Sequence, residues 1–349
     1  LVDGRDKIVG FGLTDVGPIA IRVLDRHGAA IPRLIHHRIQ AAAALRARVL
    51  PLNTSAYRLV NAAGDGLPGL VVDRYGPAAV LRLYGACWEP WLNSLTYELS
   101  KLPGVETVYR RLGVRRVDGD EGLERLQGPD QPEPLVVTEA GLRFLVRPSV
   151  GQKTGLFLDQ REHRRRVAEL SRDTDVINLF AYTGGFSVHA AAAGARRVTT
   201  VDIAAPALED AKENFRLNGI NPDQHAFVAA DAFKWTPDGP AGMVVVDPPS
   251  LSHDRGADAS ARTAYRDLAA HTGTFVAPGG IMASASCTSR LSMEKWEGAV
   301  RDGLRRAGRW SWLWRAGEPP DHPVAIAHPE GRYLKFALLH RHPGAGGRA

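Results

Sequence analysis

The part of the chain from Val176 onward alternates short apolar runs with helix-like segments. The apolar runs read DVINLFAY, RRVTTVDI, HAFVAADAF, MVVVDPP and GGIMASASC, and stretches such as APALEDAKENFRLNGI separate them. Strands joined by helices pair in parallel through right-handed crossovers, which cover both faces of the sheet. The pattern therefore predicts an α/β fold with a doubly wound, Rossmann-like sheet. Such a sheet binds ligands at the carboxyl ends of its strands, where the strand order reverses.

A glycine pair and three aspartates follow successive strands of this predicted sheet. Gly184 and Gly185 lie between the first strand and its helix, and Asp202, Asp231 and Asp247 end the next three strands. Glycine lets the backbone approach a ligand closely, and carboxylates at this edge suit ribose hydroxyls and an adenine amino group. Ordinary helix caps would explain each acid separately. The turn reads TGGFS rather than the G-x-G-x-x-G of dinucleotide sites, so the pattern favours S-adenosylmethionine over a dinucleotide.

The fifth apolar run ends at Cys287, which we expect to lie beside Asp247 on the neighbouring strand, about 4.8 Å away in strand spacing. A thiolate that adds to carbon 6 of cytosine activates carbon 5 toward methylation, and a carboxylic acid or carboxylate near N3 and N4 stabilises the charge shifted onto the ring. Pro248 and Pro249 make the segment rigid. Ser250 replaces the aromatic residue typical of amino-group methylation. Simpler alternatives are a strand end made by the prolines and a buried, structural cysteine.

The first 135 residues lack the regular alternation and predict smaller units. A chain of 349 residues suggests two or three domains. We expect a small β module with a linker helix over 1–50, a small α/β domain over 51–135, and the doubly wound domain over 136–349. Within the second part, residues 88–102 are expected to form a helix and residues 119–134 a loop or linker, because the latter are rich in Gly, Pro and acids.

The charge balance is compatible with a polyanionic partner. Lys and Arg number 44 against 38 Asp and Glu, which gives a net charge of +6. Clustered arginines contact phosphates in a two-pronged geometry and stack on bases, although solvated helix faces would explain them equally well. The clusters that we expect to contact RNA are Arg110, Arg111, Arg115, Arg116, Arg164 and Arg165.

Cysteine usage indicates a reducing, cytoplasmic environment. Cys87 and Cys287 lie 200 residues apart and match no zinc spacing, and Cys87 is expected to be structural. His322 and His328 have no partners at metal spacing, so no metal is expected. No apolar run reaches the roughly 18 residues needed to span a membrane, and Leu1 in place of Met suggests a trimmed chain.

Three tryptophans alternate along a predicted strand near the end of the chain. Trp310, Trp312 and Trp314 occupy every second position, so all three are expected on one side of the sheet. They would either pack in the core or stack on bases.

Several long blocks, in order, give the sequence a family resemblance. They are GDGLPGLVVDRYG, GQKTGLFLDQREHR, NLFAYTGGFSVHAAAAGA, VDIAAPALEDAKENFRLNG, VVVDPPS, SASCTS and DHPVAIAHPEGRYLK. The chain resembles the bacterial S-adenosylmethionine-dependent 23S ribosomal RNA methyltransferases, in particular the large-subunit cytosine-C5 enzymes. This resemblance implies a PUA-type RNA-binding module, which here lacks its first strands, a small central α/β domain, and a C-terminal class I methyltransferase domain.

The resemblance also implies a set of site residues. Relatives that methylate guanine N7 share the D-P-P segment but have no cysteine after the fifth strand, so Cys287 is the residue that decides between the target bases. By resemblance, Cys287 is the nucleophile and Asp247 assists it. The implied cofactor contacts are Phe157, Asp159, Gln160, Arg161, Phe180, Tyr182, Gly184, Gly185, Asp202, Asp231 and Asp247.

The sequence thus predicts an enzyme that forms 5-methylcytosine in 23S rRNA or a large-subunit precursor, with S-adenosylmethionine as cofactor and no membrane partner. A homodimer is compatible with the sequence. Three alternatives stay open: methylation of a guanine or adenine nitrogen, an RNA-binding assembly factor without turnover, and, least favoured, a nicotinamide dehydrogenase.

Overall fold

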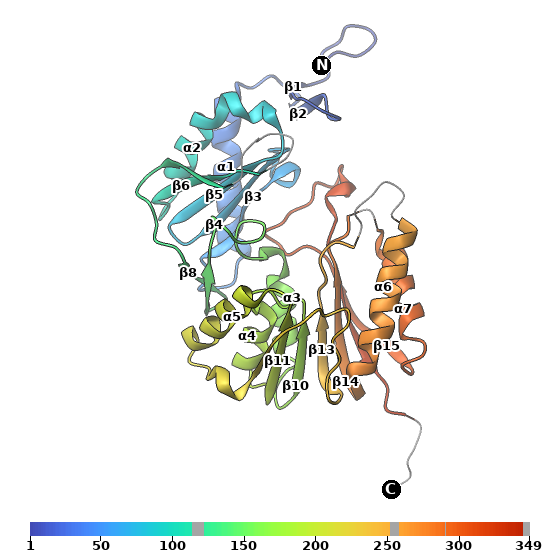
Figure 1. The fold of residues 1–349 in the computed structure, drawn as a ribbon. Coiled ribbons are helices and arrows are strands. Elements are labelled where there is room, and N and C mark those ends of the chain that lie inside the picture. The colour runs from blue at the N-terminus through green and yellow to red at the C-terminus, as the bar shows by residue number, and fades with distance from the viewer. Residues whose placement is uncertain (114–121, 252–257, 290, 345–349) are drawn as a thin grey trace. The chain divides into compact units, whose positions relative to one another are not determined.

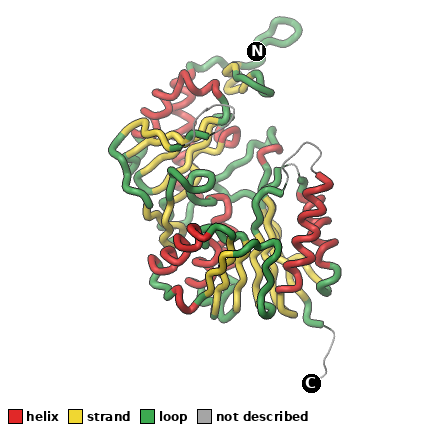
Figure 2. Tube along the Cα trace, in the orientation of Figure 1, coloured by secondary structure: helices red, strands yellow, loops and turns green. Residues whose placement is uncertain are grey.

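The computed structural model describes residues 1–113, 122–251, 258–289 and 291–344. The chain forms two compact units (Figures 1 and 2). The first contains Leu1–Asp159 and Pro319–Gly331, and the second contains Gln160–Glu318 and Arg332–Ala349. The finer division at residues 50 and 135, and the PUA-like nature of the first 50 residues, stay predictions.

The first unit is built on a five-stranded sheet with the order β3-β4-β5-β6-β7, accompanied by two separate hairpins, β1-β2 and β8-β9. The predicted linker helix is confirmed as α1, and the predicted turns join β3, β4 and β5 as antiparallel neighbours. The elements are β1 (Phe11–Thr14), β2 (Ile21–Asp25), α1 (Ile31–Val49), β3 (Ala56–Asn61), β4 (Leu70–Tyr75), β5 (Ala78–Leu83), α2 (Leu92–Ser100), β6 (Thr107–Arg111), β7 (Leu123–Gln127), β8 (Leu135–Glu139) and β9 (Leu142–Val146).

The predicted loop over 119–134 is wrong in one part. Leu123–Gln127 forms β7, which pairs antiparallel with β6 at the edge of the sheet. Its side chains are mostly exposed or half-buried, so the segment has none of the apolar alternation that marks a buried strand. Its strand conformation comes from pairing with β6.

Residues 319–331 return to the first unit and are held there by buried polar contacts. Arg46, which is 1% exposed, donates hydrogen bonds from Nη2 to Asp65 Oδ2 at 2.8 Å and to the Asp321 carbonyl at 2.7 Å. Gly64 leaves no room for a side chain, because a Cβ there would lie 1.7 Å from the carbonyl oxygen of Pro323. The segment is therefore closely fitted to the unit it joins.

The second unit is a seven-stranded mixed sheet with the order β12-β11-β10-β13-β14-β16-β15. The predicted doubly wound arrangement is confirmed, because the first five strands pair in parallel and the order reverses between β10 and β13. Two antiparallel strands, β16 and β15, extend one edge. The strands are β10 (Asp175–Leu179), β11 (Arg197–Asp202), β12 (Ala226–Ala229), β13 (Ala241–Val246), β14 (Val276–Ser286), β15 (Trp310–Ala316) and β16 (Lys335–Arg341).

Helices cover both faces of this sheet (Figure 1). On one face, α6 and α7 supply Tyr265, Leu268 and Trp296 to a core shared with Leu339 of β16. On the other face, the ring of Phe336 stacks on side chains of α3 and α4. The helices are α3 (Arg161–Ala168), α4 (Gly185–Ala192), α5 (Ala205–Leu217), α6 (Asp258–Thr272) and α7 (Met293–Leu304).

The prediction that three alternating tryptophans share one face is wrong. Trp312 and Trp314 pair with consecutive residues of β16, so the register shifts between them. Such a bulge inserts one residue and reverses the face of the side chains that follow. Trp310 and Trp312 pack against the core under α6 and α7, whereas the ring centroid of Trp314 lies 5.9 Å from that of His163 and 5.9 Å from that of Phe336 on the opposite face.

Candidate active site at the carboxyl ends of the strands

The carboxyl ends of the parallel strands bring five of the predicted residues to one rim. A row of three residues crosses the ends of β11, β10 and β13, in the order Asp202, Phe180 and Asp247. They align because the residues before them pair with one another in register. Asp231 follows the end of β12, and Cys287 follows the end of β14. The expected pairing of the strands that precede Asp247 and Cys287 is confirmed.

The turn between β10 and α4 carries unusual backbone conformations. Phe180 and Tyr182 have φ values of 57° and 50°, and Gly184, at the start of α4, has a φ of 77°. Positive φ in bulky residues costs on the order of 1–3 kcal/mol and concentrates at functional sites. A Cβ on Gly184 would lie 2.9 Å from the Cβ of Ala211, so glycine is required there for both conformation and space.

The carboxylates of Asp202 and Asp231 organise this rim. Asp202 accepts hydrogen bonds from the backbone N–H of Tyr182 at 2.7 Å and from that of Ala204 at 2.9 Å. Asp231 accepts one from Phe233 N–H at 3.0 Å. Both aspartates stay partly exposed, and a carboxylate oxygen has lone pairs for more than one donor. Each can therefore hold its loop and still accept a hydrogen bond from a ligand.

A second cluster surrounds Cys287, which is partly exposed. Thr288, 1% exposed, lies 2.9 Å through its hydroxyl from the Tyr265 hydroxyl and accepts a hydrogen bond from Leu251 N–H at 3.3 Å. These contacts connect the loop after Asp247 to the end of β14. Cys287 and Asp247 therefore follow two strand ends that these hydrogen bonds connect.

The pKa of the Tyr265 phenol is set by its burial and by nearby charges and hydrogen bonds. Burial is the largest cause that raises the pKa of this phenol, to about 12. Negative charge at Cys287 and Asp247 raises the pKa further, while hydrogen bonds to Ser286 and Thr288 oppose the increase. Tyr265 is therefore a neutral hydrogen-bonding group at physiological pH.

Three residues of this cluster were not predicted from the sequence: Tyr265, Thr288 and Lys335. Thr288 and Lys335 lie in the SASCTS and GRYLK blocks, so the resemblance marked both segments but assigned them no role. Tyr265 lies on α6 without any local motif. Its place beside the rim comes from packing alone.

The predicted FLDQR contacts are divided between the two units. Phe157 and Asp159 belong to the first unit, where Lys153 Nζ lies 2.7 Å from Asp159 Oδ2 and 4.5 Å from the centre of the Phe157 ring. Gln160 and Arg161 begin the second unit and are 3% and 0% exposed. Their role as cofactor contacts stays a prediction.

The arginines expected to contact RNA have different environments. Arg110 and Arg164 are only 8% and 2% exposed. Arg110 forms an ion pair with Glu89, and Arg164 packs against the turn, 3.0 Å from where a Cβ of Gly185 would lie. Both guanidinium groups are thus buried in the protein, and their contact with RNA stays a prediction.

The remaining arginines of that prediction are also untested. Arg111 is half-buried and donates a hydrogen bond to the Ser149 carbonyl. Arg165 is exposed, and its Nη1 lies 2.5 Å from Glu162 Oε2. Arg115 and Arg116 lie outside the described residues.

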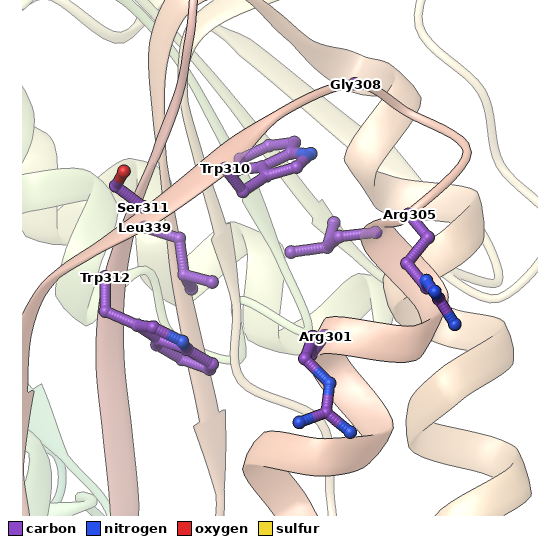
Figure 3. A pocket seen from close by; sticks show the side chains of 8 residues that line it. Arg301, Arg305, Gly308, Trp310, Ser311, Trp312 and Leu339 are labelled. Carbon is purple, nitrogen blue, oxygen red and sulfur yellow. The ribbon is translucent and has the colours of Figure 1, made fainter.

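A groove of about 130 Å³ lies at the other end of β16. In Figure 3 the rings of Trp310 and Trp312 point to the same side as Arg301 and Arg305, and the Ser311 hydroxyl points away. At the groove, Trp310 of β15 pairs with Arg341, the last residue of β16. Cys287 follows Ser286, which pairs with Lys335, the first residue of β16. Six residue steps along a strand separate these ends by roughly 20 Å, so the groove is distinct from the rim. Its lining residues are Arg301, Leu304, Arg305, Gly308, Trp310, Ser311, Trp312 and Leu339.

Comparison with known proteins identifies the family. A family model described as S-adenosylmethionine-dependent methyltransferase matches residues 107–330. The chain belongs to this family. A ribosomal RNA large subunit methyltransferase from Deinococcus radiodurans is 40% identical, with 97% of this chain and 87% of the relative covered. A ribosomal RNA large subunit methyltransferase I from Pseudoalteromonas atlantica is 33% identical, over 80% of this chain and 73% of the relative.

Solved structures support the same fold. A Streptococcus mutans protein described as a SAM-dependent methyltransferase superposes with a TM-score of 0.85 at 22% identity, covering 97% of this chain and 90% of the other. A methyltransferase structure complexed with S-adenosylhomocysteine gives a TM-score of 0.86 at 21% identity, with the same coverage. At such identities the likeness shows the fold alone, which is the class I methyltransferase fold.

S-adenosylmethionine is the cofactor of this methyltransferase, and the rim fits it. The turn at Gly184 allows close approach because it lacks a side chain and has positive φ, and the carboxylates of Asp202 and Asp231 are partly exposed. Within the described ranges, no three His, Cys, Asp or Glu side chains gather as a metal site. Among the helices the structure describes, none combines the length and apolar character needed to cross a bilayer.

Proposed function

We propose that this methyltransferase forms 5-methylcytosine in large-subunit ribosomal RNA, with Cys287 as the nucleophile. The names of its relatives support ribosomal RNA as the substrate class. The observation that carries the choice of base is a partly exposed cysteine directly after β14, beside the strand that ends at Asp247. A thiol at this place is unnecessary for methylation at nitrogen and central to methylation at a pyrimidine carbon.

The reaction begins with the Cys287 thiolate, which attacks carbon 6 of the cytosine and forms a sulfur–carbon bond. The electrons of the 5,6 double bond become available at carbon 5, and the protonated carboxyl group of Asp247, near N3 and N4, donates a hydrogen bond that stabilises the negative charge on the ring. S-adenosylmethionine, when bound, would supply the electrophilic methyl group that carbon 5 takes up, with cleavage of the sulfonium–methyl bond and S-adenosylhomocysteine as the leaving group. Loss of the carbon 5 proton to a base restores the double bond and expels the Cys287 thiolate.

The cofactor contacts in this proposal are those the rim offers. Asp202 would accept hydrogen bonds from ribose hydroxyls, Asp231 would face the adenine amino group, and the backbone at Gly184 and Gly185 would lie against the ligand. Phe180 and Tyr182 belong to the same strained turn. The target base must be unstacked to reach a thiol at the end of a strand.

The first test uses purified wild-type protein, Cys287→Ala and Cys87→Ser with labelled S-adenosylmethionine and large-subunit rRNA that lacks the modification. Cys87 is a matched control, because it is buried in the first unit and burial raises its pKa to about 11. We expect 5-methylcytidine in digests from wild-type and Cys87→Ser protein, and a loss on the order of 10³-fold or more for Cys287→Ala. Methylated guanine or adenine, or unchanged 5-methylcytidine with Cys287→Ala, would refute the proposal.

A second test captures the covalent step. RNA with 5-fluorocytosine at the target cannot lose the carbon 5 substituent as a proton, so the sulfur–carbon 6 bond should persist. We expect a denaturation-resistant protein–RNA complex with wild-type and Cys87→Ser protein and none with Cys287→Ala.

The RNA-binding surface and the compartment complete the proposal. A basic net charge of +6 suits an RNA partner. Of the arginines proposed to contact RNA, Arg111 and Arg165 are the more accessible described ones, and the PUA-type module would add affinity. Ribosomal RNA as substrate implies the bacterial cytoplasm. A homodimer would be tested by the concentration dependence of the molar mass.

A further inference from the structure

Lys335 is a buried lysine next to the proposed nucleophile. It is the first residue of β16, pairs with Ser286 at the end of β14, and is only 4% exposed. Its Nζ donates hydrogen bonds to the carbonyl oxygens of Thr288 at 2.9 Å and Tyr333 at 2.8 Å. Ser286 and Thr288 flank Cys287 in the sequence, so the backbone of Lys335 pairs with the residue before the thiol and its ammonium group binds the carbonyl oxygen of the residue after it.

This buried charge has no carboxylate partner at ion-pair distance among the described residues. The carboxylate of Glu318 acts electrostatically on Lys335. Its Oε1 accepts hydrogen bonds from the backbone N–H groups of Tyr333 at 2.6 Å and Leu334 at 2.8 Å. Burial lowers the pKa of Lys335, and negative charge at Glu318 and Cys287 acts in the opposite direction. A buried ammonium group without a paired carboxylate favours a nearby group that can become an anion.

Two other described ionisable groups near Cys287, Tyr265 and Asp247, carry no positive charge. Tyr265 of α6 is neutral with its pKa raised to about 12. Asp247, directly after β13, is an acid, and in its ionised form it would oppose a thiolate. Lys335 is a described cation that interacts electrostatically with Cys287.

We propose that Lys335 is a positioning residue that holds Cys287 as a thiolate before the substrate binds. The thiol proton passes to water, Lys335 keeps its own proton, and the ion pair leaves the sulfur ready to attack carbon 6. When the product is released, the same ammonium group stabilises the expelled thiolate. The role of Lys335 in catalysis rests on the function proposed above.

The test measures how the rate of Cys287 alkylation by iodoacetamide depends on pH, in a Cys87→Ser background and without RNA or cofactor. An unperturbed thiol has a pKa of about 8.5, and we expect a lower midpoint for Cys287. Lys335→Met should raise the midpoint by about 1–3 pH units, because an opposite charge at close range shifts a pKa by that amount. Lys335→Arg should restore most of the shift, and Lys295→Met, an exposed lysine of the same unit, should leave it unchanged.

The outcomes separate this proposal from the proposed function. A wild-type midpoint at or above about 8.5 refutes the role of Lys335, and this result needs no variant to fold. An equal midpoint in folded Lys335→Met protein, as judged by its circular dichroism and cofactor binding, also refutes it. If Lys335 shifts the midpoint but no 5-methylcytidine is formed, the role of Lys335 in the ionisation stands and the proposed function fails.

Discussion

Substitution of Gly184 by alanine tests whether the turn between β10 and α4 is limited by conformation, by space, or by both. A φ of 77° costs alanine about 1–2 kcal/mol. The new Cβ would lie 2.9 Å from the Cβ of Ala211, and relief of such overpacking typically costs about 1–3 kcal/mol. We therefore expect the free energy of unfolding of the second unit to fall by about 2–5 kcal/mol.

Two further variants separate the contributions. Gly219 has a φ of 70°, but a Cβ there would meet nothing within 4 Å, so Gly219→Ala should cost only the conformational part, about 1–2 kcal/mol. Ala211→Gly removes the methyl group that the new Cβ would meet, and by itself costs about 1 kcal/mol in helix α5. The double variant has no methyl group for the new Cβ to meet. Its loss of stability should therefore be smaller than the sum of the two single losses by about 1–3 kcal/mol.

Urea unfolding followed by circular dichroism measures the wild type and all four variants, and an unchanged dependence on denaturant indicates that the change lies in stability. Strictly additive effects of Gly184→Ala and Ala211→Gly would refute the steric argument. Equal losses for Gly184→Ala and Gly219→Ala would lead to the same conclusion.

Three other predictions concern the first unit. Gly64→Ala should destabilise it by about 1–3 kcal/mol through overlap with the carbonyl oxygen described above, while Gly4→Ala in the same unit, whose Cβ would meet nothing within 4 Å, should change urea unfolding by less than about 0.5 kcal/mol. Arg46→Met leaves the carboxylate of Asp65 buried without its guanidinium partner and should cost about 3–5 kcal/mol in the same assay; a loss below about 1 kcal/mol would contradict this. Burial lowers the pKa of His322 below its usual 6.5, so the unfolded state binds more protons below that pH. The contribution of neutral His322 to the free energy of unfolding should be present above pH 6.5 and should fall by up to about 1.4 kcal/mol per pH unit below it. This pH dependence should be absent in His322→Gln.

Local patterns were sufficient for much of the fold. The alternation of strands and helices after Val176 predicted the parallel sheet, because buried strands need continuous apolar runs and the crossovers need helices. The same pattern located Asp202, Asp231, Asp247 and Cys287 at strand ends, since parallel strands place all their carboxyl ends on one edge.

Where neighbours far away in the sequence decided the outcome, the predictions failed. β7 has too little apolar pattern to be recognised and forms because β6 offers hydrogen bonds to it. The bulge in β15 moves Trp314 to the other face, and no property of the WSWLW segment alone indicates an extra residue. Arg110 and Arg164 belong to basic clusters that look solvated in the sequence, yet both are buried.

The sequence by itself determined the α/β class, the methyltransferase resemblance and the residues at the strand ends, because periodicity and motifs are properties of neighbouring residues. Only the tertiary structure decided which charge stands beside Cys287. Lys335 reaches the carbonyl oxygen of Thr288 across 47 residues of sequence, because β16 folds back antiparallel on β14. That pairing is set by the burial of both strands in one sheet, so the contact exists only once the sheet has formed.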